Sequence, residues 1–338
     1  MTTHIARWDL DKTYLRTEFD TLRELVRTAL ERADQKRTNP GASTLLREMV
    51  RAGVRVHILS GSPEQMRRRL EDKLRLDGIT WETFTLKPNL QNLLRLRFRA
   101  MRDQLGYKLP ALLRARARLA EAGEPAGECT ETLFGDDAEA DAYVYSLYAD
   151  FLAGRVGDDV LARVLERGRL YADVVADTMD AARTVEREDV VERIFIHLEG
   201  QTPPGDFQAY GSRVVPFYNY LQAAFVLYED ARLGADGVLR VAVELVTEHR
   251  FDGEALARSY LDLVRRGHVR GIRLEAIGAA IDRWVANGHL PAVDELRVLN
   301  ARLPAMGEAV RAETRRPEIA PMPDYVALVG AHNPRRRR

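Results

Sequence analysis

Two aspartates near the amino terminus, Asp9 and Asp11, have a spacing that could support joint chemistry. They follow an apolar run, and Thr13 stands two residues further on. This pattern predicts a buried strand over 4–9 followed by a tight loop. At the end of a strand, one carboxylate could attack phosphorus while the other moves a proton to and from the bridging oxygen. Taken alone, the motif fits a helix N-cap after a strand about equally well.

Two further strand ends carry polar side chains. Apolar runs over 54–59 and 131–134 predict strands that end at Ser60 and at the pair Asp136 and Asp137. Strands that alternate with helices indicate an α/β fold, a parallel sheet with helices on both faces. Because the carboxyl ends of parallel strands line one edge of the sheet, we expect these side chains to meet there.

The remaining pattern divides the chain into three parts. We expect an α/β domain over 1–155, a mainly α-helical region over 156–316 and an extended basic tail over 317–338. In the first part, helices are expected over 18–33, 43–52, 63–74, 90–105 and 109–121, with a short strand within 79–86. In the second, they are expected over 158–198, 216–232, 237–249, 253–266, 273–287 and 292–315.

The motifs resemble, in the same order, those of the haloacid dehalogenase (HAD) superfamily. The segment from Asp9 to Thr13 resembles the first motif, Ser60 the second, Lys108 the third, and 135–141 the fourth. The resemblance covers about residues 4–155 and implies a HAD-like Rossmannoid sheet. It also implies a phosphatase that works through a phosphoaspartate.

Two details are similar to one branch of that superfamily. Asp136 and Asp141 are five residues apart with Tyr145 four residues later, and 60–63 is a Ser-Gly-Ser-Pro turn. Both resemble the conserved domain of the actin-patch-associated phosphatidate phosphatases and their uncharacterised bacterial relatives. A phosphatidate-like substrate is suggested by this likeness alone.

The resemblance also implies a role for each residue. Asp9 would be the nucleophile, Asp11 the general acid and base, and Thr13 a support for the loop. Ser60 would bind a phosphoryl oxygen, and Lys108 would neutralise charge on Asp9 and the phosphoryl group. Lys108 is expected to open the helix over 109–121; Lys87 is the competing choice for this lysine. The implied magnesium ligands are Asp9, Asp11 through its carbonyl, and Asp136, with Asp137 or Asp141 as the further ligand or its partner.

Physical chemistry accounts for such a set of residues. A carboxylate that attacks a phosphate dianion meets like-charge repulsion, which a cation offsets. Mg²⁺ prefers oxygen ligands, so two or three carboxylates and one carbonyl suffice. The seven histidines and one cysteine are scattered and show no zinc-binding spacing.

Composition limits the partners. The 338-residue chain has a formal net charge of +0, so no global field draws it to nucleic acid, although four arginines end the chain. The single cysteine, Cys129, fits a reducing cytoplasmic location. The sequence has no run of about 18 uncharged apolar residues, so we expect no transmembrane helix.

We therefore expect a Mg²⁺-dependent phosphohydrolase acting on a phosphorylated small molecule or lipid. The alternative is a phosphatase-like binding or scaffold module with little activity, whose helical half recruits a protein partner or a second copy. The helical half could also be a lid over the active site. Transfer to an acceptor other than water is equally compatible with the sequence.

Overall fold

The fold is described from a computed structural model, which covers residues 3–16, 37–87, 101–124, 126–287, 292–313 and 322–331. Its centre is a six-stranded sheet in the order β3-β2-β1-β4-β5-β6, and every neighbouring pair is parallel. The strands are β1 (Thr3–Trp8), β2 (Arg55–Pro63), β3 (Thr83–Lys87), β4 (Cys129–Asp136), β5 (Val191–His197) and β6 (Val214–Phe217). The predicted α/β class with a parallel sheet is confirmed.

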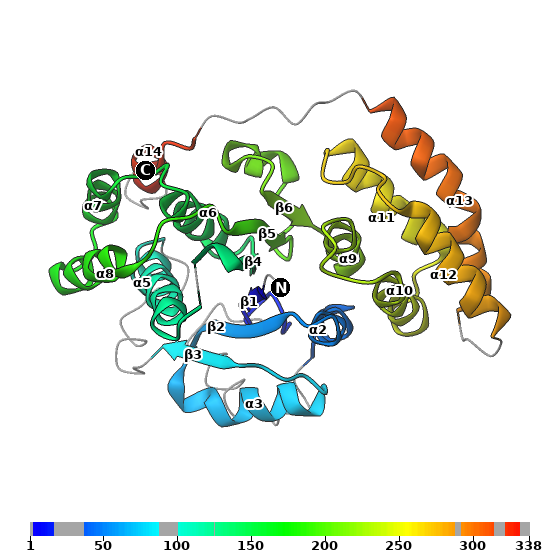
Figure 1. The fold of residues 1–338 in the computed structure, drawn as a ribbon, viewed down its shortest axis with the longest axis horizontal. Helices are drawn as coiled ribbons and strands as arrows, with labels where there is room; N and C mark the ends of the chain where they lie inside the picture. Colours follow the sequence, from blue (N-terminus) through cyan, green and yellow to red (C-terminus); the bar gives the residue numbers. More distant parts are fainter. Residues whose placement is uncertain are drawn as a thin grey trace.

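Helices cover both faces of this sheet (Figure 1). The α-helices of the α/β part are α2 (Ala42–Arg51), α3 (Arg67–Leu76), α5 (Met101–Glu121), α6 (Asp141–Leu152), α7 (Asp158–Arg167) and α8 (Ala172–Thr184). Those that follow the last strand are α9 (Tyr220–Glu229), α10 (Ala235–His249), α11 (Gly253–Arg265), α12 (Leu274–Ala286), α13 (Val293–Ala312) and α14 (Tyr325–Ala331). Short 3₁₀ turns occur at η2 (Glu64–Met66), η3 (Ala126–Glu128) and η4 (Pro204–Tyr210).

Alternate side chains along the strands pack into two hydrophobic clusters, one on each face of the sheet. Phe134 and Phe195 belong to the cluster that includes α2, α3 and α9, whereas Leu133 and Ile194 belong to the cluster with α5 and α6. Successive side chains of a strand point to opposite faces, so both faces of a central strand must be apolar. The rings of Phe134 and Phe195 stack with centroids 4.8 Å apart, which continues the packing from β4 to β5.

One buried ionic network lies among β1, β4 and the helices beside them. Arg7 donates to both carboxylate oxygens of Glu131, at 2.8 and 2.7 Å. Arg116 and Tyr148 donate to the same carboxylate at 3.2 and 2.9 Å. The arginines lower the pKa of Glu131 to about 2 against the opposing effect of burial. The network therefore links β1 and β4 to α5 and α6 through one buried carboxylate and two arginines.

Two strands lie where the sequence pattern predicts helix. The expected helix over 158–198 is wrong in its last part, where β5 forms, and 214–217, at the start of the expected helix over 216–232, forms β6. β5 pairs with the free edge of β4, and β6 pairs with β5. The sheet therefore crosses the expected domain limit at residue 155, and the helical part begins after Phe217.

Four other expectations differ from the structure or fall outside it. Lys108 lies in the middle of α5 rather than at the start of a helix, because that helix already runs from Met101. The expected extended tail contains α14, whose Tyr325 is buried and donates to Asp150 at 2.6 Å. The expected helix over 18–33 and most of the one over 90–105 lie outside the described residues.

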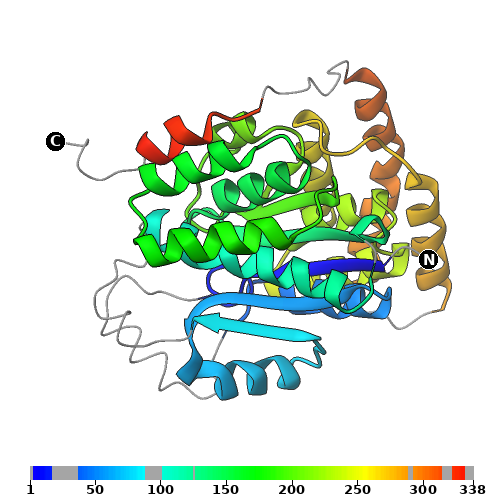
Figure 2. The ribbon, with the colours of Figure 1, turned by 60° about the vertical axis from the view of Figure 1, so that its left-hand side comes forward.

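The turned view in Figure 2 shows α14 lying beside α7, although most of the helical region separates them in sequence. Within the part of the chain that the structure describes, no helix combines the length and the apolar character needed to cross a membrane.

Candidate active site

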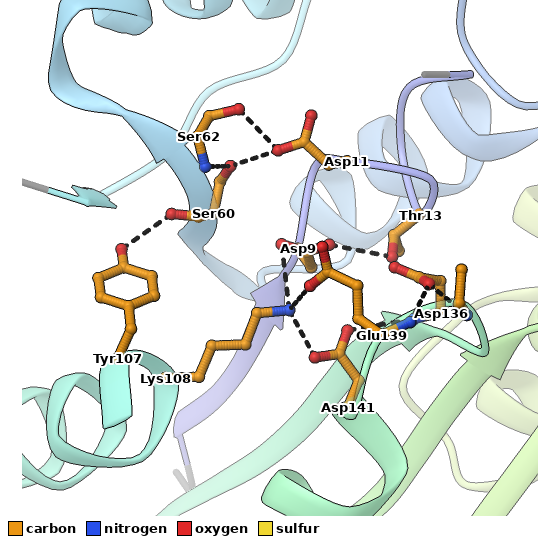
Figure 3. Close-up of polar contacts among 11 residues, drawn as sticks. Asp9, Asp11, Thr13, Ser60, Ser62, Tyr107, Lys108, Asp136, Glu139 and Asp141 are labelled. Carbon is orange, nitrogen blue, oxygen red and sulfur yellow. Dashed lines mark hydrogen bonds and ion pairs between the residues drawn. The ribbon is translucent and has the colours of Figure 1, made fainter. Parts of the chain in front are cut away.

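The carboxyl ends of β1, β2 and β4 bring the predicted residues to one place (Figure 3). Asp9 directly follows β1, and its main-chain amide donates to the carbonyl of Phe134 on β4 at 3.0 Å. Ser60 lies within β2 and Asp136 ends β4. The loop after each strand therefore starts at the same edge of the sheet.

Four carboxylates form a cluster at this edge. Asp9, Asp136, Glu139 and Asp141 each place one oxygen within 4.8 Å of the others. The aspartates are almost fully buried, and the side chain of Glu139 is 14% exposed. Carboxylates are rarely buried together unless cations balance them, so this cluster is a functional candidate.

Lys108 reaches from α5 into the middle of the cluster, as Figure 3 shows. Its Nζ lies 2.5 Å from Oδ1 of Asp141, 2.9 Å from Oε2 of Glu139 and 3.6 Å from Oδ1 of Asp9. The ammonium is fully buried, and these carboxylates hold the pKa of Lys108 well above its usual value against the opposing effect of burial. Lys108 is therefore a permanent positive charge at neutral pH.

The loop after β4 is shaped by its own hydrogen bonds. Oδ1 of Asp136 accepts from the amides of Ala138 and Glu139 at 2.7 and 3.0 Å, which turns the chain back toward the cluster. Oδ2 of Asp141 accepts from the amide of Asp136 at 3.2 Å. A side chain at Gly135 would place its Cβ 2.3 Å from that Oδ2 atom, so glycine is required there.

Negative charge exceeds positive charge in the cluster. If all four carboxylates were ionised, Lys108 would leave a sum of −3. Burial, with the neighbouring carboxylates, raises the pKa of Asp9 and of Asp136 well above the usual value, although Lys108 opposes this. Burial likewise raises the pKa of Glu139. The site would hold protons or a further cation to balance this charge.

The donor set fits a hard divalent cation such as Mg²⁺. Oδ1 of Asp9 and Oδ2 of Asp136 are buried and accept no hydrogen bond from the described residues. By contrast, both oxygens of Asp141 are occupied, one by Lys108 and the other by the Asp136 amide. Carboxylate oxygens are the ligands that Mg²⁺ prefers. Asp9 and Asp136 therefore offer free ligand atoms, and Asp141 holds Lys108 and the loop in place.

Asp11 occupies a different environment, outside the carboxylate cluster. Its Oδ2 accepts from the hydroxyls of Ser60 and Ser62 at 3.0 and 2.6 Å. Its Oδ1 is buried and accepts no hydrogen bond from the described residues. Tyr107, next to Lys108, donates to the carbonyl of Ser60 at 2.8 Å and so fixes the end of β2. Asp11 is therefore held through one carboxylate oxygen only.

The structure also places the remaining predicted residues. Thr13 donates to Oδ2 of Asp9 at 3.4 Å and is fully buried. Asp137 is not part of the cluster and accepts from the amides of Gly200 and Thr202 at 2.6 and 2.8 Å. Lys87 lies 5.9 Å from the centroid of the Tyr107 ring, and it is Lys108 that faces Asp9.

Glu139 is the cluster member that the sequence pattern did not single out. It stands between Asp136 and Asp141, in a run where every acidic residue could have been a ligand. The sequence shows several acidic residues directly after a strand, but it does not show which of their side chains enter the cluster. That choice depends on the turn made by Asp136.

A separate cavity of about 800 Å³ lies between α2, α10 and α12. Arg240 and Arg51 line it, but both pair with Glu48, which also lines it. Because these charges satisfy one another, the unbalanced cluster around Lys108 remains the stronger candidate for chemistry.

Comparison with protein-family models, with curated proteins and with solved structures found no match for this chain. The geometry of the site is therefore the basis for its functional interpretation.

Proposed function

We propose that this protein is a Mg²⁺-dependent phosphohydrolase that forms an aspartyl phosphate on Asp9, as the resemblance to the HAD superfamily implies. One observation carries the proposal. Asp9 has a free buried oxygen beside Lys108, and Asp11, two residues later, is held by two serine hydroxyls. Two neighbouring carboxylates in different environments suit the roles of nucleophile and proton carrier, once Lys108 and a bound cation keep Asp9 ionised despite its raised pKa.

The first half of the reaction uses both aspartates. A carboxylate oxygen of Asp9 attacks phosphorus, and the bond from phosphorus to the leaving oxygen breaks. Asp11, protonated at the oxygen that the serines leave free, donates that proton to the leaving oxygen. Lys108 offsets the negative charge of Asp9 and of the transferring group.

The second half returns the enzyme to its starting state. Asp11, now ionised, takes a proton from water, and the resulting hydroxide attacks phosphorus. The bond between phosphorus and Asp9 breaks, which releases phosphate and leaves Asp11 protonated again. Bound Mg²⁺, held by Asp9 and Asp136, would lower the repulsion between the carboxylate and the phosphoryl oxygens.

The test is turnover of an aryl phosphate with Mg²⁺ or with excess chelator. We expect activity with Mg²⁺, loss with chelator, and a phosphoryl adduct on Asp9 in acid-quenched protein by mass spectrometry. Asp9→Asn should abolish both signals, because an amide is a far poorer nucleophile. Asp137→Asn is the matched control, since that carboxylate faces main-chain amides instead. An adduct on another residue would overturn the mechanism.

The same measurement addresses the alternative function. A chain that binds Mg²⁺ but gives neither turnover nor an adduct with any of a panel of phosphorylated metabolites, lipids and phosphopeptides would be a binding module. Adding alcohol acceptors to the active enzyme separates hydrolysis from phosphoryl transfer, because only transfer yields a new ester.

A further inference from the structure

The loop that carries Asp9 and Asp11 is held through two main-chain carbonyls. The carbonyl of Lys12 accepts from Nδ2 of Asn39 at 2.9 Å and from Nδ1 of His197 at 3.1 Å. The carbonyl of Thr13 accepts from the same Asn39 nitrogen at 2.7 Å. These donors lie outside the motif, and each is almost wholly buried, at 6% exposure or less.

The helical region supplies a further donor. Tyr220, the first residue of α9, is fully buried and donates its hydroxyl to the carbonyl of Thr13 at 2.5 Å. Its ring lies 5.9 Å from that of Trp8, the last residue of β1, and 5.4 Å from that of His197. The helical region therefore contacts both the loop and the strand that leads into it.

The backbone of this loop needs such support. Lys12 has a φ of 59°, in the left-handed region that residues other than glycine rarely adopt. A strained conformation of this kind persists only where its surroundings determine it. Since Lys12 follows Asp11 directly, a change in its backbone would move the carboxylate that handles the proton.

The Asn39 segment is held by the helical region as well. The amide of Gly41 donates to Oε1 of Glu244 on α10 at 2.9 Å. A Cβ at Gly41 would lie 3.0 Å from the Cβ of Tyr220, so the turn and α9 are in close contact. Both supports of the Thr13 carbonyl thus depend on helices that follow the sheet.

We infer that Tyr220, with Asn39 and His197, is a positioning residue that sets the place of Asp11, and that the helical region buttresses the catalytic loop. The inference rests on the proposed function, in which Asp11 protonates the leaving group. It assigns to the helical region a role distinct from that of a lid or an independent module.

Tyr220→Phe tests this, because it removes one hydroxyl and keeps the ring. Tyr228→Phe is the matched control: Tyr228 lies on the same helix, is buried, and donates its hydroxyl to the carbonyl of Arg273 at 2.8 Å, away from the site. Both variants would be compared with the wild-type full chain on two substrates, phenyl phosphate and 2,4-dinitrophenyl phosphate, in saturating Mg²⁺.

Misplacement of Asp11 should affect the two substrates differently. Phenyl phosphate needs its leaving oxygen protonated, so Tyr220→Phe should lower formation of its phosphoenzyme by about 10- to 100-fold, a range typical of small misplacements. For 2,4-dinitrophenyl phosphate, whose leaving group needs little protonation, the fall should be under about threefold. KM should change little for either substrate, and Tyr228→Phe should resemble the wild type. A partly unfolded variant would lose the same factor on both substrates.

Two outcomes would overturn the inference: an unchanged rate on phenyl phosphate in Tyr220→Phe, or an equal loss on both substrates in a variant that keeps the wild-type Tm. Asn39→Asp provides a second test, because it replaces a donor to both carbonyls with an acceptor and should show the same leaving-group dependence. If the wild type forms no phosphoenzyme on Asp9 with either substrate, the proposed function itself has failed. Failure of the proposed function can therefore be told from failure of the positioning inference.

Discussion

Removing divalent cations should destabilise the protein, and more so at high pH. The reason is the excess of negative charge around Lys108. Burial raises the pKa of Asp9, Asp136 and Glu139, so these three groups bind more protons in the folded chain than in the unfolded chain above their usual pKa values. Stability therefore falls as the pH rises from those unfolded values through the raised folded ones. A bound cation would offset this fall, because it favours the ionised carboxylates.

The size of the effect follows from binding and from chain length. A ligand at 100 times its Kd stabilises the folded state by about 2.7 kcal/mol. With an unfolding entropy of about 2.1 cal/mol/K per residue, the 338 residues give about 0.7 kcal/mol/K if the chain unfolds as one unit. Mg²⁺ should therefore raise the Tm by about 4 °C.

The assay is thermal unfolding followed by circular dichroism at pH 6, 7 and 8, in Mg²⁺ or in chelator. The difference in Tm between Mg²⁺ and chelator should grow with pH; buried histidines with lowered pKa values also change stability with pH, but they affect both conditions alike. Asp136→Asn should raise the Tm in chelator and reduce the gain from Mg²⁺, whereas Asp137→Asn should keep that gain. Equal Tm values in Mg²⁺ and chelator at pH 8 would refute the assigned cation site.

Three more perturbations have defined outcomes. Asp11→Asn should keep the stabilisation by Mg²⁺ yet lower aryl phosphate turnover by about 10²–10⁴-fold, measured as steady-state rates, and phosphoenzyme should accumulate with an activated leaving group. Glu131→Gln should lower the free energy of unfolding in urea by about 3–5 kcal/mol, because it leaves buried arginines without their carboxylate. Since the pKa of Glu131 is lowered to about 2, this contribution is present above the usual pKa near 4.5 and is lost as the pH falls toward 2. Gly135→Ala should weaken Mg²⁺ binding in calorimetry, because the new Cβ displaces Asp141; unchanged affinity would contradict that account.

The strand ends were predictable because their signals are local. Apolar runs that stop at Asp9, Ser60 and Asp136 mark buried strands, and parallel strands bring their carboxyl ends together. The sequence therefore placed much of the cluster without knowledge of its contacts. Which acidic side chain joins the cluster was harder to predict, because the placement of Glu139 in it and of Asp137 outside it depends on main-chain hydrogen bonds.

The extent of the sheet was less predictable. Residues 191–197 have the apolar spacing of a short strand, but they follow a helical pattern that begins at 158, and local periodicity extends the expected helix through them. Their strand conformation depends on pairing with β4, a contact that local periodicity does not contain. The supports of the loop that carries Asp9 and Asp11 could not be predicted for the same reason, since Asn39, His197 and Tyr220 carry no motif of their own.

These supports affect when the site can form during synthesis. Thr13 meets Tyr220 across 207 residues of sequence, and Lys12 meets His197 across 185. At about 5–20 residues per second, Tyr220 is added about 10–40 s after Thr13. Such distant contacts are closed late in folding. The aspartates therefore leave the ribosome well before their loop can be fixed, and we expect the proposed phosphatase activity to appear in a growing chain only after α9 has emerged and docked.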